Sequence, residues 1–224
     1  ALALHGVSKE EIERGDWVVT PNEFEPTSIV DCELYLLPSY RRNLASMSRV
    51  RFHIGAAEVM GRVYSLQGDY FQPGKTAYMQ MRLEQPVVCA YGDRFVIRTY
   101  SPMTTIGGGR VLDANATKHR RRDQGVIETL RCYSRGNLEE IVETFIRRSP
   151  KPISSAEIRR KFALTSREVS SAISRLEESG KVAKVEGELY LHMEVVADLE
   201  KKVIETLQSY QSNERLRWEC LRRS

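Results

Sequence analysis

The segment Gly74-Lys75-Thr76 ends like a phosphate-binding loop, the motif that cradles nucleotides in many proteins. That motif needs a glycine five residues before its Gly-Lys pair, so that successive backbone N–H groups can curl around a phosphate. Asp69 occupies this position, and Gly68 lies one residue too far back. The segment also leads into a strand pattern, not from a strand into a helix. We therefore interpret it as a hairpin turn.

Histidines and cysteines offer no better catalytic or metal-binding arrangement. The histidines form no H-x-x-x-H pair, the cysteines form no C-x-x-C pair, and no histidine has an evident nucleophile partner. We therefore expect no catalytic residue, no metal site and no disulfide framework, and we expect reduced thiols. The residues concerned are His5, His53, His119 and His192, and Cys32, Cys89, Cys132 and Cys220.

Basic side chains gather at two places, although the net charge of +4 is mild. A loop over residues 38–49 contains Arg41, Arg42 and Arg49, and residues 118–122 read Lys-His-Arg-Arg-Arg. Lysine and arginine bind nucleic-acid phosphates without requiring a base sequence. The alternative for each cluster is a solvated surface segment, since runs of charge often have no other role.

Apolar and polar residues alternate in several short runs over residues 50–113. In the first run the apolar side chains at 50, 52 and 54 point one way, and Arg51 and His53 point the other. A period of two, with glycine, proline or aspartate bounding each run, predicts antiparallel strands with one buried face. Five or six such strands fit a closed β-barrel over residues 25–115, which leaves no open sheet edge.

Several linked motifs in this stretch follow one order. They are His-x-Gly-x-x-Glu-Val-x-Gly-Arg-Val from His53, Arg-Leu-Glu-x-Pro-Val-Val from Arg82, Gly-Asp-Arg-Phe-x-Ile-Arg from Gly92, and Thr-Ile-Gly-Gly-Gly-x-Val from Thr105. This order resembles the third domain of the translation-factor GTPases. The spelling of residues 100–102 and 106–113 is most similar to the bacterial selenocysteine-specific elongation factors.

A helical period replaces the alternation from Asn137 onward. Apolar residues then recur at 138, 141, 142, 145 and 146, and capping boxes begin at Ser154 and Thr165. Gly180 is a helix-ending glycine, and a Glu-Gly turn at 186–187 joins two short strands. Three helices and a hairpin predict a winged helix over residues 137–193.

The resemblance also assigns the flanking segments. Residues 1–24 resemble the end of the second barrel of these factors, and residues 116–136 are interpreted as a basic linker with a short helix. Residues 194–224 are expected to begin a second, incomplete winged helix, helical to Tyr210 with a further short helix from Asn213. The whole is expected to be a C-terminal fragment lacking the GTPase domain.

The family holds aminoacyl-tRNA through its third barrel, so the resemblance implies a tRNA-binding surface on this one. Carried over by position, its candidate residues are Arg41, Arg42, Arg51, His53, Gln85 and Ser101. In the basic linker, Lys118, Arg120, Arg121 and Arg122 are candidates for contact with RNA backbone. The implied partners are selenocysteinyl-tRNA, the ribosome and, through a later winged helix, an mRNA hairpin.

The resemblance thus implies part of a factor that inserts selenocysteine at UGA codons. GTP and Mg²⁺ would bind only in the intact factor, and this chain would be no enzyme itself. The alternative from another class is a winged-helix DNA-binding regulator with a β-barrel accessory domain. That function requires a strongly basic recognition helix, whereas the expected third helix presents Arg167 and Arg175 among serines and glutamates. We therefore interpret this winged helix as a spacer. No apolar run approaches the roughly 20 residues that span a bilayer, so we expect a cytoplasmic protein without membrane contact.

We predict that the chain does not bind GTP, because the turn at Gly74-Lys75-Thr76 lacks the phosphate-cradling glycine. Titration calorimetry with GTP and Mg²⁺ should give no saturable heat. Saturable binding that Lys75→Ala abolishes would contradict the interpretation of this turn.

Overall fold

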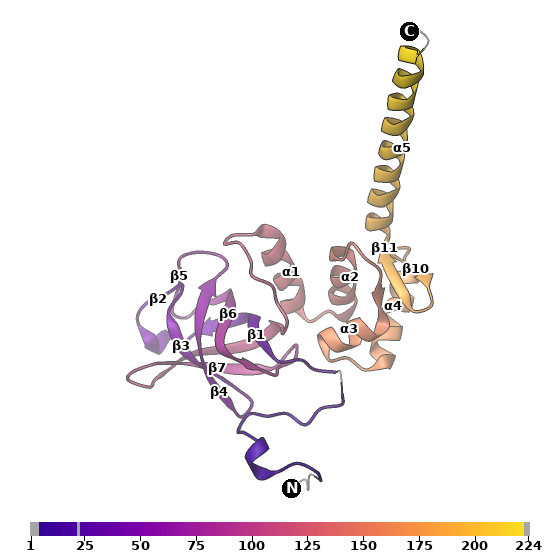
Figure 1. Cartoon of the computed structure of the whole chain (residues 1–224). Helices are drawn as coiled ribbons and strands as arrows, with labels where there is room; N and C mark the ends of the chain where they lie inside the picture. The colour runs from indigo at the N-terminus through magenta and orange to yellow at the C-terminus, as the bar shows by residue number, and fades with distance from the viewer. Residues whose placement is uncertain (1–4, 22, 222–224) are drawn as a thin grey trace. The chain divides into compact units, whose positions relative to one another are not determined.

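The computed structural model describes residues 5–21 and 23–221 (Figure 1). The chain divides into two compact units. Unit 1 comprises residues 1–137 with 159–164, and unit 2 comprises residues 138–158 with 165–224. Of the segment assigned to a preceding barrel, residues 1–4 and 22 lie outside the described residues, as do residues 222–224 at the other end.

Unit 1 is built on a closed antiparallel barrel of six strands, which confirms the predicted fold. The strands follow the order β1-β6-β4-β3-β7-β8 around the wall, and β2 and β5 form a separate two-stranded ribbon. The eight strands are β1 (Thr27–Leu36), β2 (Leu44–Ala45), β3 (Arg49–Ile54), β4 (Ala57–Ser65), β5 (Tyr70–Phe71), β6 (Thr76–Val87), β7 (Arg94–Thr99) and β8 (Thr105–Asp113).

Alternating burial along the strands confirms the predicted faces. In β3 the side chains of Val50, Phe52 and Ile54 are buried, whereas those between them are not. The core also holds two cysteines: burial raises the pKa of the Cys89 thiol to about 12 and that of Cys32 well above its ordinary value. Fully buried side chains from five of the wall strands include Leu34, Leu36, Phe52, Met79, Met81, Ile97 and Ile106.

Three consecutive glycines in β8 let this strand approach both of its neighbours. A Cβ atom on Gly107 would lie 2.7 Å from the Tyr35 carbonyl oxygen, and one on Gly109 would lie 1.8 Å from that of Glu33. On the other side, a Cβ on Gly108 would lie 2.7 Å from the Phe95 carbonyl oxygen. The glycines therefore have a structural role in closing the barrel, because any side chain would collide with backbone.

The segment after β8 contains the expected short helix, and it is packed against the barrel as part of unit 1. Helix α1 (Gln124–Arg135) begins at Asp123, whose side chain accepts from Val126 N, and it contacts β1 and β8. Arg110 of β8 donates to the Ser134 carbonyl oxygen, and Tyr91 Oη donates to that of Tyr133 at 2.6 Å. Four apolar side chains of α1 are buried, and the whole segment belongs to unit 1.

The described part of the N-terminal segment passes the β3–β4 turn. It contains one 3₁₀ turn, η1 (Lys9–Glu11), and no described strand before β1. Gly15 approaches Ala57 so closely that a Cβ would lie 2.8 Å from the Ala57 Cβ, and the Trp17 ring stands 5.8 Å from that of Phe24. This segment therefore contacts the barrel at one end of β3.

Unit 2 has the element order of a winged helix. Its helices are α2 (Leu138–Arg148), α4 (Ser166–Glu178) and the first half of α3 (Ser155–Phe162), whose residues from Arg159 onward belong to unit 1. Helix α2 packs against α4 and β11. The sheet has the order β10-β11-β9, from β9 (Ile153–Ser154), β10 (Val182–Glu186) and β11 (Leu189–His192). Both predicted capping boxes are present, at Ser154 with Glu157 and at Thr165 with Glu168.

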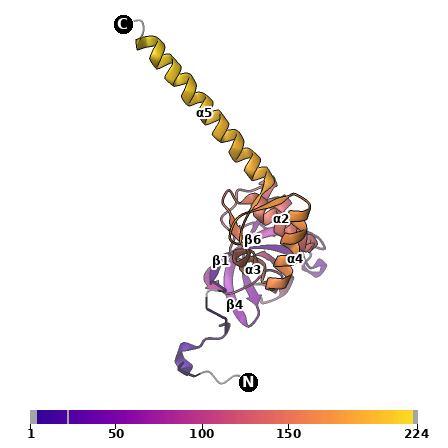
Figure 2. The same ribbon diagram turned by 90° about the vertical axis from the view of Figure 1, so that its right-hand side faces the viewer.

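Helix α5 (Met193–Leu221) runs without interruption in Figures 1 and 2. The expectation of a separate helix from Asn213 is therefore wrong. Its first turns contact β11 and α2, whereas Val203, Ile204 and Leu207 further along are more than half exposed.

We predict that Gly109→Ala lowers the thermal unfolding temperature, because its methyl group would collide with the Glu33 carbonyl oxygen. Overpacking of this kind costs about 1–3 kcal/mol or more. The matched control is Gly68→Ala, at a loop position where no atom lies within 4 Å of the added Cβ. Calorimetric scans of both variants decide the matter: equal melting temperatures would show that β8 can move away from β1 at no cost.

Candidate nucleic-acid interface

Three arginines lie side by side on the outer face of the barrel. Arg49 on β3 is the register partner of Arg62 on β4, and Arg62 is the register partner of Arg82 on β6. Like charges directly opposite one another destabilise a sheet. This row of Arg49, Arg62 and Arg82, the arginine row, is therefore a feature that folding alone does not favour.

Each arginine in the row is held by a different neighbour. Arg49 forms a fork with Glu84, with Nε–Oε1 and Nη2–Oε2 distances of 2.7 Å. Arg62 Nη1 donates to the Met47 carbonyl oxygen at 3.0 Å. The guanidinium carbon of Arg82 lies 3.9 Å from the centre of the Tyr64 ring. Hydrogen bonding to Arg49 lowers the pKa of the Glu84 carboxyl, so the fork is charged at neutral pH.

A second group of planar side chains surrounds Tyr100, which is 57% exposed. The guanidinium carbons of Arg49 and Arg51 lie 5.5 and 5.4 Å from the centre of its ring. Arg51 Nη1 also donates to Glu58 Oε1 at 2.5 Å, and this hydrogen bond lowers the pKa of the Glu58 carboxyl. Exposed aromatic rings beside guanidinium groups suit the stacking contacts that RNA bases make.

The basic run after β8 lies across the same outer face. Residues 117–122, the basic strap, begin where the Thr117 carbonyl oxygen accepts from Gln80 Nε2 of β6 at 2.8 Å. The strap ends where Arg122 N donates to the Leu66 carbonyl oxygen at 3.1 Å, just beyond β4. Because Gln80 Oε1 also accepts from Arg82 Nε at 3.0 Å, the strap continues the arginine row.

Two strap residues leave their charge unpaired within the described part of the chain. Arg121 pairs with Asp69 at 2.5 Å, and Arg122 lies 3.8 Å from the same carboxylate. Lys118 and Arg120 are exposed and form no ion pair with any described residue. These two cations are therefore available to a ligand.

His119 points inward from the strap and meets a buried carboxylate. Asp31 on β1 is only 2% exposed, and its Oδ2 lies 2.5 Å from His119 Nε2. Its Oδ1 accepts from Gln80 Nε2 at 2.9 Å. Burial raises the pKa of Asp31, while the hydrogen bond to Asp31 raises the pKa of His119.

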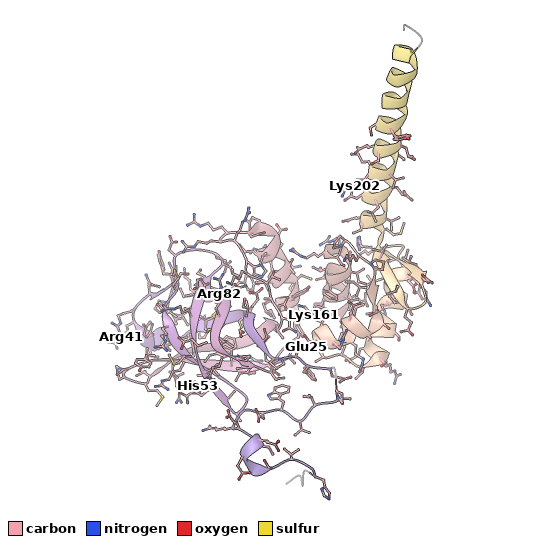
Figure 3. The ribbon with its side chains drawn as sticks, viewed as in Figure 1. Glu25, Arg41, His53, Arg82, Lys161 and Lys202 are labelled. Atoms are coloured by element: carbon pink, nitrogen blue, oxygen red, sulfur yellow. The ribbon has the colours of Figure 1, made fainter. Side chains whose placement is uncertain are left out.

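The residues expected from the sequence to bind RNA fall at separate places. Arg41 and Arg42 are exposed on the loop after the 3₁₀ turn η2 (Pro38–Tyr40), and Arg42 stacks over Tyr40 at 5.6 Å. Figure 3 labels Arg41, His53 and Arg82 well apart on unit 1. Arg51 lies beside the arginine row, and Ser101 is exposed next to Tyr100.

His53 and Gln85 lie nearer the margins of this face. His53 is near the β3–β4 turn, where its Nδ1 lies 3.9 Å from Glu58 Oε2 and its Nε2 is buried without a partner. Burial lowers its pKa, so His53 is neutral at neutral pH. Gln85 is exposed on β6, next to Glu84.

Sequence reasoning missed Arg62, Arg82, Tyr64 and the pairing of Asp31 with His119. Both arginines occupied outward positions of expected strands, and that was the available signal. Their alignment depends on the register between strands, which alternation alone leaves open.

Other features of the described residues give less evidence of a binding site. A groove on the opposite part of the wall, around β8, is lined by Tyr35, Val96, Arg94 and the three glycines. No group of three or more metal-binding side chains occurs among the described residues. Within the same residues, no helix combines the length and the apolar character needed to cross a membrane.

Comparisons with known proteins agree on one assignment. Residues 33–118 match the family model of the selenocysteine-specific elongation factor, beta-barrel domain. A selenocysteine-specific elongation factor of Desulfomicrobium baculatum is 33% identical over 142 residues, covering 63% of this chain and 22% of the relative. One from Haemophilus influenzae is 26% identical over 126 residues, covering 55% and 20%.

A solved structure supports the fold. The crystal structure of the bacterial selenocysteine-specific elongation factor EF-Sec matches with a TM-score of 0.69, at 14% identity, over 92% of this chain and 31% of that one. The barrel and the segments around it thus share the fold of part of that elongation factor. Residues 33–118 are thus similar to the beta-barrel domain of the selenocysteine-specific elongation factors. The chain spans about a fifth of the length of the curated relatives it matches.

Helix α4 of unit 2 presents little positive charge. Its outward side chains are exposed as expected, but Arg175 is paired with Glu139 of α2. Tyr190 of β11 is only 8% exposed and belongs to the core. Among the described residues, α4 and the wing therefore offer no exposed aromatic ring on which unpaired RNA bases could stack.

We predict that unit 2 does not read an mRNA hairpin. Replacing both Arg167 and Arg175 by glutamine should leave the affinity of the chain for a hairpin and for an unrelated RNA unchanged within about twofold, since Arg175 is already neutralised. Mobility shifts at physiological salt measure both affinities. A selective loss of hairpin binding would assign the reader to α4.

Proposed function

We propose that this chain is the part of a selenocysteine-specific elongation factor that grips selenocysteinyl-tRNA. The observation that carries the proposal is the arginine row across β3, β4 and β6, continued by the basic strap. Like charges on neighbouring strands repel one another, although separate contacts hold each of the three guanidinium groups. A polyanion that binds across them offsets that cost.

The chemistry of the face suits duplex RNA in particular. Double-stranded RNA is recognised through its shape, its phosphates and its 2′-hydroxyl groups, because side chains cannot read its narrow major groove. The face offers guanidinium groups for phosphates and two tyrosines, Tyr64 and Tyr100, beside them. It requires no base sequence, which fits a tRNA stem.

The remaining functions follow from the proteins that this chain resembles. The intact factor would bind GTP and Mg²⁺ outside this chain, act on the ribosome in the cytoplasm and reach an mRNA hairpin through a later winged helix. This chain would contribute tRNA binding and a connection, and would catalyse no reaction. The DNA-binding alternative gains no support, because α4 has one arginine paired with glutamate and the barrel carries the basic face.

The proposal predicts that Arg62→Gln with Arg82→Gln weakens binding of a selenocysteine tRNA about 5- to 150-fold at low salt. This is the scale of two phosphate hydrogen bonds of about 0.5–1.5 kcal/mol each. The logarithmic dependence of affinity on salt should also become shallower by about 1–2, since fewer counterions are released.

The matched control is Arg94→Gln, an exposed arginine on β7 beside the groove around β8. Fluorescence anisotropy of labelled tRNA, together with melting temperatures to verify folding, compares the variants. Equal affinities for the double variant, the control and the unaltered chain would show that the arginine row does not bind tRNA.

A further inference from the structure

Asp31, which pairs with His119, occupies a position of β1 where a solvent-exposed side chain would be expected. Asp31 alternates with inward-facing Val30 and Cys32, so its side chain lies on the outer face of β1. It is nevertheless buried, because the basic strap crosses over it and inserts His119. A carboxylate covered in this way needs hydrogen-bond partners, and both of its oxygens have one.

The same contacts reach the arginine row through a single amide group. Gln80 Nε2 donates to Asp31 Oδ1 and to the Thr117 carbonyl oxygen, while Gln80 Oε1 accepts from Arg82 Nε. The amide cannot turn over without losing all three contacts, since a flipped amide would place its NH₂ group against the Arg82 donor. The strap, the buried carboxylate and Arg82 are therefore fixed together.

The surroundings favour a positive charge on His119. Besides Asp31, the carboxylates of Asp113 on β8 and Asp123 at the start of α1 act on it from neighbouring elements. Asp113 is itself paired with Lys161, from the part of α3 that belongs to unit 1. The strap therefore places a cation among carboxylates on the barrel wall.

We propose that His119 and Asp31 act as a clasp that holds the basic strap against the barrel, so that Lys118 and Arg120 extend the arginine row. His119 is then a positioning residue: it contacts no RNA itself, and it determines where two phosphate-binding side chains stand. This inference rests on the proposed function for its RNA-binding part, whereas the clasp can be tested without RNA.

The clasp should respond to pH in one direction. The pKa of His119 is raised in the folded chain above the ordinary value of about 6.5. Its contribution is therefore complete below the unfolded pKa and is lost as the pH rises through the raised value. Deprotonation leaves one N–H donor at most and removes the charge attraction, so the strap should loosen as the pH rises through the raised pKa of His119.

Limited digestion with trypsin tests the clasp directly, because the strap offers cleavage sites at Lys118 and at residues 120–122. In His119→Ala, cleavage within the strap should be at least about fivefold faster than in the unaltered chain, since cleavage follows the population of the open form. Asp31→Asn should have the same effect. An unstructured reference peptide in the same tube corrects for the pH dependence of the protease.

Two further variants separate positioning from loss of charge. His119→Lys keeps a cation opposite Asp31, so the strap should stay protected and its cleavage should no longer change between pH 6 and pH 9. Arg120→Ala removes one exposed charge without touching the clasp. Binding of a selenocysteine tRNA should therefore weaken about 5- to 20-fold in His119→Ala, but only about 2- to 5-fold in Arg120→Ala.

Each outcome decides one part of the proposal. Unchanged strap cleavage in both His119→Ala and Asp31→Asn, with melting temperatures that show a folded chain, overturns the clasp. Faster cleavage with unaltered tRNA affinity shows that the strap does not belong to the RNA-binding face. If the unaltered chain binds no tRNA, the proposed function fails, and the cleavage rates still support or reject the clasp.

Discussion

Closure of the barrel depends on how near β8 can come to β1 and β7. Backbone carbonyl groups of both neighbours occupy the space where side chains of Gly107, Gly108 and Gly109 would lie. Once the wall is closed, every residue of a strand must point either into the core or away from it. The pairing of β3, β4 and β6 then fixes the positions of the arginines on the outer face.

Much of this architecture could be predicted from local patterns. Alternation gave the strands and their faces, and the capping pairs at Ser154 and Thr165 gave two helices of unit 2. These features involve residues within a few positions of each other, where spacing alone determines the outcome. No comparable capping signal marks the end of the long helix α5, so the sequence analysis did not predict that it continues past Asn213.

The functional face could be predicted only in part. Arg51 and the basic run were recognised from their types and positions, but the run was assigned to a linker. Its attachment depends on Asp31, which is 88 residues away in sequence and occupies a position that alternation predicts to be exposed. The residues near Asp31 in the sequence do not show whether its side chain is exposed to solvent or buried beneath a later segment of the chain. Contacts between residues far apart in the sequence therefore determine which outward-facing side chains are buried.

The contacts of the arginines on the outer face also restrict the motion of these long side chains. A free arginine side chain samples many rotamers, and fixing it costs up to about 2 kcal/mol of conformational entropy. Here the guanidinium groups of Arg49 and Arg82 are already held, the first by Glu84 and the second between Tyr64 and Gln80. These two side chains have therefore lost most of their rotamer freedom on folding, before any ligand binds. Such a preorganised face selects among ligands by their geometry, since its side chains do not adapt to each new shape.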